Sequence, residues 1–161
     1  MTITSGSKRP SHIRMGRPCW RAMLRELAAR GESRRESGAF LLGQRRGRRP
    51  RVTYVVYFDD LEPESLNGAV HLTTTAYSRL WVICRERGIE VLADVHTHPG
   101  GCVQQSEIDE ENPLVGQRGH IAIIIGHFAQ KIVSLREVGI YEYHGDDGWE
   151  ARPRAVSHGR W

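Results

Sequence analysis

The segment from Ile89 to His98 constrains this chain most, because an apolar run there ends in two histidines. The run up to Val95 is short and apolar, which predicts a buried strand. Residues two apart on an extended segment point to the same face, so the imidazoles of His96 and His98 should emerge together. Asp109 can reach the same place if the intervening loop folds back. Two imidazole nitrogens, one carboxylate oxygen and one open position are typical of a catalytic zinc site rather than a structural one.

The full pattern is His-x-His, seven further residues and then Ser-x-x-Asp, with Pro99 directly after His98. It resembles the JAMM motif, also called MPN-plus, of the JAB family of zinc isopeptidases. The family also carries a glutamate upstream, followed by small residues and an apolar strand that ends in glycine. Glu36 stands at the start of such a segment, which ends at Gly43. The resemblance covers roughly residues 18 to 150.

The sequence departs from the family pattern at one position of the motif. Gln105 stands before the motif serine, where the family often has proline. This difference affects the stiffness of the loop more than its chemistry.

The resemblance implies a role for each of these side chains. His96, His98 and Asp109 would bind one Zn2+ per chain, with a water in the fourth position. Such a metal lowers the pKa of the water from about 15.7 to about 7. Glu36 would accept the water's proton and pass it to the leaving amine. Ser106 would donate a hydrogen bond to the oxyanion of the tetrahedral intermediate, a contact worth about 3 kcal/mol.

These side chains also have ordinary structural interpretations. A histidine at a strand end is often a half-exposed polar residue, and Glu36 could be a surface charge before a strand. Ser106 could be only a helix N-cap, because Ser-x-x-Asp has capping-box spacing; both roles can hold at once. Two histidines and a carboxylate can also hold Fe(II) in oxygenases. We favour zinc because Glu36 and Ser106 have no role in that scheme.

Composition sets limits on the class of protein. The 161 residues, 26% charged and 39% hydrophobic, predict one soluble domain. No run approaches the roughly eighteen apolar residues that cross a bilayer, and the polar start of the chain lacks a signal-peptide core. Three irregularly spaced cysteines fit a reducing compartment, so we expect a cytoplasmic protein without membrane partners. They are Cys19, Cys84 and Cys102, and Cys102 is interpreted as a loop residue near the site rather than a ligand.

Much of the net charge of +4 comes from an arginine cluster in a predicted turn. The cluster could contact an acidic partner or nucleic acid. We favour a solvated hairpin turn and do not expect nucleic acid as a partner, because no aromatic residues are interleaved to stack bases. The cluster comprises Arg45, Arg46, Arg48, Arg49 and Arg51.

The order of elements predicts an α+β fold, a single JAB/MPN-like domain in which helices flank a mixed, curved β-sheet. We expect a flexible basic arm over residues 1–16, the zinc peptidase domain over 17–153 and a C-terminal tail over 154–161. Helices are expected over 18–31 and 76–87, the second with Leu80, Trp81, Ile83 and Cys84 facing the core. Strands are expected over 38–43, 52–58, 89–98, 120–126, 131–136, 138–144 and 149–152, with a polar loop over 59–68 and a short extended piece over 70–72.

The predicted chemistry is hydrolysis of an amide or isopeptide bond by zinc-activated water. The resemblance narrows the substrate to the glycine-ended tail of a ubiquitin-like protein, released by deconjugation or by precursor processing. Such a tail would lie extended beside a sheet edge, with residues 70–75 and the loop after His98 as candidates for lining its channel.

The compact chain resembles stand-alone prokaryotic JAB proteins. Some of these are encoded beside relatives of ubiquitin-activating and ubiquitin-conjugating enzymes, including in antiphage defence operons. The resemblance therefore implies a ubiquitin-like protein or its conjugates, together with such enzymes of the same operon, as partners in antiviral defence.

Three other classes stay open. A non-catalytic MPN scaffold typically lacks the metal ligands, whereas a RadC-type, DNA-associated relative is favoured only by the arginine cluster. A small-molecule zinc hydrolase or a sulfur-carrier processor would act on short glycine-ended peptides. The remaining histidines are interpreted as structural or surface residues, with His127 as the main candidate for a further role; they are His12, His71, His120, His127, His144 and His158.

Overall fold

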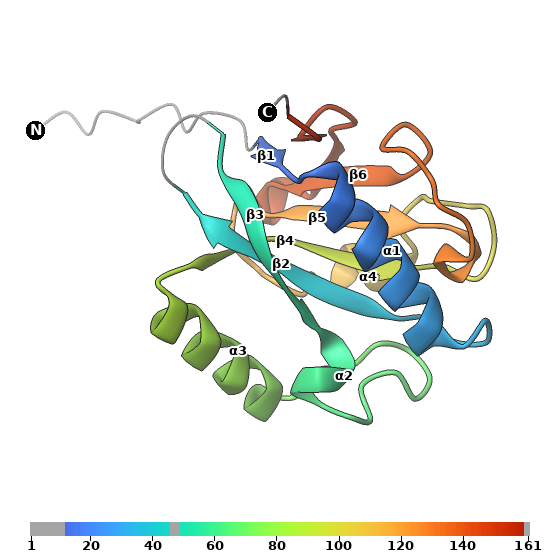
Figure 1. The fold of residues 1–161 in the computed structure, drawn as a ribbon, viewed down its shortest axis with the longest axis horizontal. Helices are drawn as coiled ribbons and strands as arrows, with labels where there is room; N and C mark the ends of the chain where they lie inside the picture. The colour runs from blue at the N-terminus through green and yellow to red at the C-terminus, as the bar shows by residue number, and fades with distance from the viewer. Residues whose placement is uncertain (1–11, 46–48, 160–161) are drawn as a thin grey trace, which may run out of the picture.

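A mixed eight-stranded sheet with four α-helices forms the described part of the molecule (Figure 1). This computed structural model describes residues 12–45 and 49–159; most of the predicted arm, together with Arg46 and Arg48 of the arginine cluster, lies outside these residues. The predicted α+β class with a mixed, curved sheet is confirmed. Within the described residues, no helix is long and apolar enough to cross a membrane.

The strand order is β7-β6-β5-β4-β2-β3-β1-β8. At the centre, β2 is antiparallel to both β3 and β4, and β4 is parallel to β5. The strands are β1 Ile13–Arg14, β2 Gly38–Gln44, β3 Arg51–Tyr57, β4 Glu90–Thr97, β5 Ile121–Ile125, β6 Gly139–Tyr143, β7 Trp149–Ala151 and β8 Val156–Ser157. The helices are α1 Arg17–Gly31, α2 Phe58–Leu61, α3 Thr74–Arg87 and α4 Glu107–Glu111, with 3-10 turns over His127–Ala129 and Gly145–Asp147.

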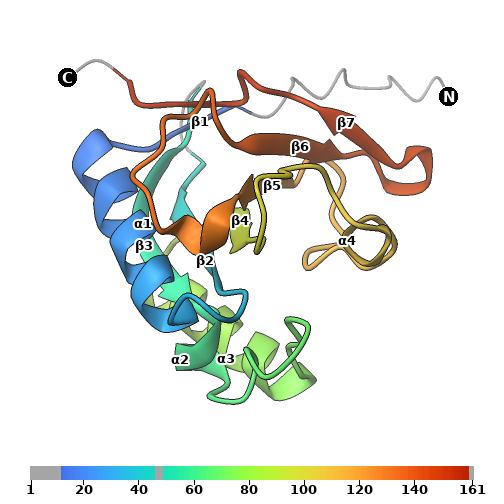
Figure 2. The ribbon, with the colours of Figure 1, turned by 90° about the vertical axis from the view of Figure 1, so that its right-hand side faces the viewer.

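Apolar side chains pack on both faces of the central strands. On one face, α1 buries Trp20, Leu24 and Leu27, which recur at three- and four-residue intervals as a helix stripe requires. On the other face, α2 and α3 bury Phe58 and Leu80 against β2 and β3. Figure 2 shows α1 and α4 on opposite sides of the sheet, with α2 and α3 at one end. Because both faces of β4 are covered, the end of this strand is held rigidly.

The prediction for α3 is largely confirmed, with one error on its buried face. The Thr73 hydroxyl accepts a hydrogen bond from the Ala76 amide at 3.5 Å, and Gly88 ends the helix with a φ of 62°. Leu80 and Cys84 are buried one turn apart, whereas Trp81 is 49% exposed. Trp81 was expected in the core, but it lies about 100° around the helix from Leu80 and misses the buried stripe.

The sheet extends past the domain limits drawn from the sequence. Residues 12–16 were assigned to a flexible arm, yet β1 pairs with β3 and β8, and both Ile13 of this strand and Met15 just after it are buried. Likewise, β8 lies in the predicted tail and buries Val156. A strand of two residues is too short to show an alternating pattern in the sequence. Because β1 and β8 are held in place by the strands beside them, periodicity could not have predicted either one.

Two local predictions are wrong. Residues 131–136 form no strand; there the Val133 carbonyl accepts a hydrogen bond from Trp20 Nε1 at 2.8 Å, so a side chain takes the place of a strand partner. Residues 70–72, expected as a short extended piece, belong to no helix or strand, so that prediction is not tested. The predicted loop over 59–68 begins with α2, because Phe58 and Leu61 are buried there.

Candidate metal centre

Three predicted ligand side chains meet beyond the end of β4. His96 Nε2 lies 3.1 Å from His98 Nε2 and 3.3 Å from Asp109 Oδ1, and His98 Nε2 lies 3.2 Å from Asp109 Oδ2. For tetrahedral Zn–N and Zn–O bonds of about 2.0–2.1 Å, the ligand atoms would be about 3.3–3.4 Å apart. The observed separations therefore fit a single divalent cation held by two imidazoles and a carboxylate.

The ring of His98 is oriented by the backbone of its own loop. His98 Nδ1 lies 3.1 Å from the Cys102 carbonyl oxygen. Because a carbonyl can only accept, Nδ1 must carry a proton, so Nε2 is the ring atom that can bind a metal once it gives up the proton that it shares with Asp109. Cys102 thus contributes its backbone, and its exposed thiol does not belong to the ligand cluster. The Nδ1 atom of His96 is buried and has no hydrogen-bond partner among the described residues.

The electrostatics of the cluster favour an anionic Asp109. Burial opposes its charge, but hydrogen bonds from His96 and His98 outweigh that effect and hold the pKa of Asp109 well below its usual range. The hydrogen bond to Asp109 raises the pKa of His98 against the effect of burial, and the nearby charge of Glu36 adds to the rise. The surroundings of the His98 imidazole thus favour positive charge, as a cation site requires.

Helix α4 fixes Ser106 and Asp109 relative to each other. Ser106 Oγ accepts a hydrogen bond from the Asp109 amide at 3.2 Å, and the Ser106 amide donates to Asp109 Oδ2 at 2.8 Å. This capping box is the one that the Ser-x-x-Asp spacing predicts. The Ser106 hydroxyl uses a lone pair in this bond, so its proton can still be donated to another acceptor.

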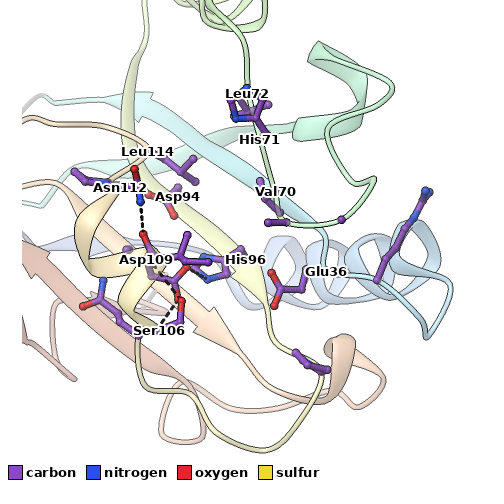
Figure 3. Close-up of a pocket in the computed structure, with 18 of the residues that line it drawn as sticks. Glu36, Val70, His71, Leu72, Asp94, His96, Ser106, Asp109, Asn112 and Leu114 are labelled. Carbon is purple, nitrogen blue, oxygen red and sulfur yellow. Dashed lines mark hydrogen bonds and ion pairs between the residues drawn. The ribbon is translucent and has the colours of Figure 1, made fainter.

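Glu36 reaches the same region from the chain that enters β2. Gly38 and His96 are Cα partners in the β2–β4 ladder, which sets the start of β2 beside the metal strand. A Cβ at Gly38 would lie 2.2 Å from the Phe58 ring and 2.6 Å from the Val95 carbonyl oxygen, so only glycine fits there. Figure 3 shows the Glu36 carboxylate facing His96.

A cavity of about 930 Å³ lies beside the metal centre, and we call it the metal-centre cavity. Glu36, His96, Ser106 and Asp109 line it together with side chains from the 68–72 segment (Figure 3). His71, interpreted from sequence as a structural or surface residue, is one of these. The remaining lining residues include Val70, Leu72, Tyr77, Asp94, Pro99, Gln105, Ile108, Asn112, Leu114, Phe128 and Trp149.

Sequence reasoning missed a buried histidine–aspartate pair on the wall of this cavity. His120 Nε2 lies 2.6 Å from Asp94 Oδ2, and the two side chains are 2% and 3% exposed. Asp94 lines the cavity and stands two residues before His96 on β4. The alternation that was used for the two histidines would also have placed Asp94 on their face of the strand.

His127 supports the loop after His98 instead of adding a ligand. The His127 amide donates to the Gly100 carbonyl and the Phe128 amide donates to the His98 carbonyl, each at 2.9 Å. The turn that makes these bonds is left-handed, with φ of 53°, 51° and 56° at His127, Phe128 and Ala129. Non-glycine residues adopt this conformation at a cost, so the surrounding contacts must hold the turn in place.

Comparison with known proteins gives the family. Residues 17–138 match the family described as "Prokaryotic homologs of the JAB domain". The chain belongs to this family. The resemblance drawn from the motif residues is therefore confirmed at the level of the family, and the match runs from the first residue of α1 to the residue before β6.

Solved structures of similar proteins agree on the JAB/MPN fold. A protein from Desulfitobacterium hafniense is 17% identical with a TM-score of 0.60, covering 91% of this chain and 94% of that one. A protein from Salinibacter ruber is 18% identical with a TM-score of 0.60, covering 86% and 88%. A JAB1/MPN domain protein from Archaeoglobus fulgidus is 17% identical with a TM-score of 0.51, covering 91% and 99%.

Proposed function

We propose that this JAB-family protein is a zinc-dependent peptidase that cleaves the amide or isopeptide bond after the C-terminal glycine of a ubiquitin-like protein. The observation that carries the proposal is the spacing of 3.1 to 3.3 Å among the ligand atoms of His96, His98 and Asp109. Glu36 and Ser106 line the same cavity, which supplies a base and a hydroxyl donor.

Each residue of the proposed active site has a separate role. His96, His98 and Asp109 hold the zinc ion, which when bound supplies a Lewis acid that makes water a nucleophile near neutral pH. Glu36 accepts the proton of the attacking water and delivers it to the amine that leaves. Ser106 donates its hydroxyl proton to the oxygen that gains charge at the scissile carbonyl. The proposed reaction requires no nucleophilic side chain, because the attacking group is water.

The 70–72 segment suits an extended substrate tail. Val70 and Leu72 line the cavity but belong to no strand of the described sheet. Their backbone groups can therefore pair with an added strand, while the apolar walls contact alternate side chains of the tail.

Partners follow from the proposed reaction. The ubiquitin-like protein or its conjugates would be the substrate, and activating-type and conjugating-type enzymes of the same operon would make those conjugates. An antiviral role is proposed on the resemblance to stand-alone prokaryotic JAB proteins of defence operons.

The test uses the ubiquitin-like product of a neighbouring gene, fused at its C-terminal glycine to a reporter. The zinc-loaded protein should release the reporter, and Glu36→Gln should lower the rate by about 100-fold or more while keeping its zinc. Glu86→Gln, which removes an exposed carboxylate on α3, is the matched control and should cleave like the wild type. Equal cleavage by Glu36→Gln and the wild type would refute Glu36 as the base.

The two alternative functions predict different experimental results with the same purified protein. A non-catalytic MPN scaffold would hold no zinc, so its metal content would not change in Asp109→Asn. A RadC-type relative is favoured by one specific observation, the arginines beside β3, and predicts salt-dependent DNA binding without release of the reporter.

A further inference from the structure

A second hollow lies on the sheet at the end away from the metal centre. It has a volume of about 380 Å³, and we call it the arginine hollow. Along β2, the hollow is at Gln44 whereas the metal centre is beside Gly38, a separation of about 20 Å at the rise of an extended strand. Six residues line it: Arg14, Gln44, Arg49, Arg51, Thr53 and Ile89.

The strand register sets two arginines directly opposite each other. Arg14 of β1 and Arg51 of β3 are Cα partners, and Gln44 of β2 is the partner of Arg51 on its other side. None of the lining residues is acidic, so the lining itself supplies no compensating charge.

One of these guanidinium groups has an unmet hydrogen bond. Arg14 Nε is buried and has no hydrogen-bond partner within residues 12–45 and 49–159. An unpaired buried donor costs free energy, and an acceptor that entered the hollow would recover it. A bound anion would offer an acceptor to the guanidinium group of Arg14, which lines the hollow.

The surroundings are positive as well. Burial lowers the pKa of His12, and the charges of Arg49, Arg152 and Arg14 lower it further. Arg87 stacks over the Tyr54 ring at 3.9 Å, beside Thr53. The nearby carboxylate of Glu90 is engaged by Arg45 at 3.6 Å.

We propose that the arginine hollow binds a phosphoryl group, carried either by a free phosphorylated compound or by a nucleic-acid strand. A guanidinium presents two parallel N–H groups that match the oxygens of a phosphate. Arginines from three positions of the chain, with the Thr53 hydroxyl and the Gln44 amide, offer more donors than the two oxygens of one carboxylate can accept. The turn arginines alone would fit a solvated loop, but Arg14, which is distant in sequence and half-buried, lines the same hollow.

The test is calorimetric titration of the folded chain with inorganic phosphate. The wild type should bind with one site per chain, and Arg49→Gln/Arg51→Gln should weaken binding about tenfold or more. Arg21→Gln/Arg25→Gln is the matched control, because it removes two exposed arginines from α1 and changes the net charge equally. It should bind like the wild type. Asp109→Asn should also bind like the wild type, which separates the arginine hollow from a metal-bound phosphate.

A labelled single-stranded oligonucleotide distinguishes the two sources. Binding that phosphate displaces, and that Arg49→Gln/Arg51→Gln weakens, would assign the phosphoryl group to a strand; phosphate binding without oligonucleotide binding would assign it to a free compound. The proposal is overturned if the wild type does not bind phosphate, or if both double variants lose binding equally. It also fails if Asp109→Asn abolishes binding or if an oligoglutamate peptide competes as well as phosphate.

Discussion

Ser37 and Thr97 hold the two halves of the candidate site together. The Ser37 amide donates to Thr97 Oγ1 at 2.9 Å, and the Thr97 amide donates to the Ser37 carbonyl at 2.9 Å. Both residues are fully buried, and Ser37 Oγ also donates to the Leu27 carbonyl of α1 at 2.7 Å. Glu36 precedes Ser37, and His96 and His98 flank Thr97, so these bonds fix the proposed base relative to the proposed ligands.

Thr97→Val should therefore impair both stability and catalysis. The substitution keeps the shape of the side chain but leaves the buried Ser37 amide without its acceptor, which costs about 1–3 kcal/mol. Displacement of Glu36 should lower turnover by about tenfold to 100-fold, because catalysis is sensitive to small errors in position. Urea unfolding and reporter release measure the two effects.

Thr97→Ser is the control for that variant, since it retains the hydroxyl. It should keep most of the stability and turnover, and bound zinc should be unchanged in both variants. Wild-type turnover in Thr97→Val would show that the Ser37–Thr97 bonds do not position Glu36.

Alkaline pH should destabilise the fold through Tyr77. Burial raises the pKa of Tyr77 to about 12, with a smaller contribution from the charge of Asp94, and its hydroxyl donates to the Leu114 carbonyl at 2.7 Å. The unfolded chain releases this proton near pH 10, so the stabilisation is complete below about pH 10 and is lost as pH rises towards about 12. Tyr77→Phe should therefore show a smaller loss of unfolding free energy over that range than the wild type. An equal loss would mean that Tyr77 does not carry the effect.

Neighbouring residues of α3 should differ sharply in their effect on stability. Leu80 is fully buried, so Leu80→Ala should lower the free energy of unfolding by about 2–5 kcal/mol. Trp81 is 49% exposed, and Trp81→Ala should cost less than about 1 kcal/mol despite removing a larger side chain. Thermal or urea unfolding of the two variants compares them directly. A larger loss in Trp81→Ala than in Leu80→Ala would contradict the packing described for α3.

The candidate site was predictable where its geometry is local. His96 and His98 share a face because strand residues alternate, and Ser106 and Asp109 are tied by a capping box within one helical turn. The strand that carries the histidines is mostly apolar up to Val95, which predicted its burial. When the residues of a site interact with others only a few positions away, their spacing in the sequence is enough to predict the geometry.

Contacts between distant segments could not be predicted in the same way. Ser37 and Thr97 are 60 residues apart, and the sequence around each of them gives no indication that they form hydrogen bonds with each other. β1 is two residues long and exists because β3 and β8 lie beside it. The exposure of Trp81 likewise depends on how α3 packs against the sheet. The periodicity of the α3 sequence does not specify that packing.

The central claim is that His96, His98 and Asp109 hold one divalent cation. Crystals grown with zinc, measured at the zinc absorption edge, test it most directly. We expect one anomalous peak per chain, bonded at about 2.0–2.2 Å to both Nε2 atoms and to the Asp109 carboxylate. Zinc-grown crystals in which these three side chains point apart, with no peak between them, would contradict the metal centre and the hydrolytic function proposed for it.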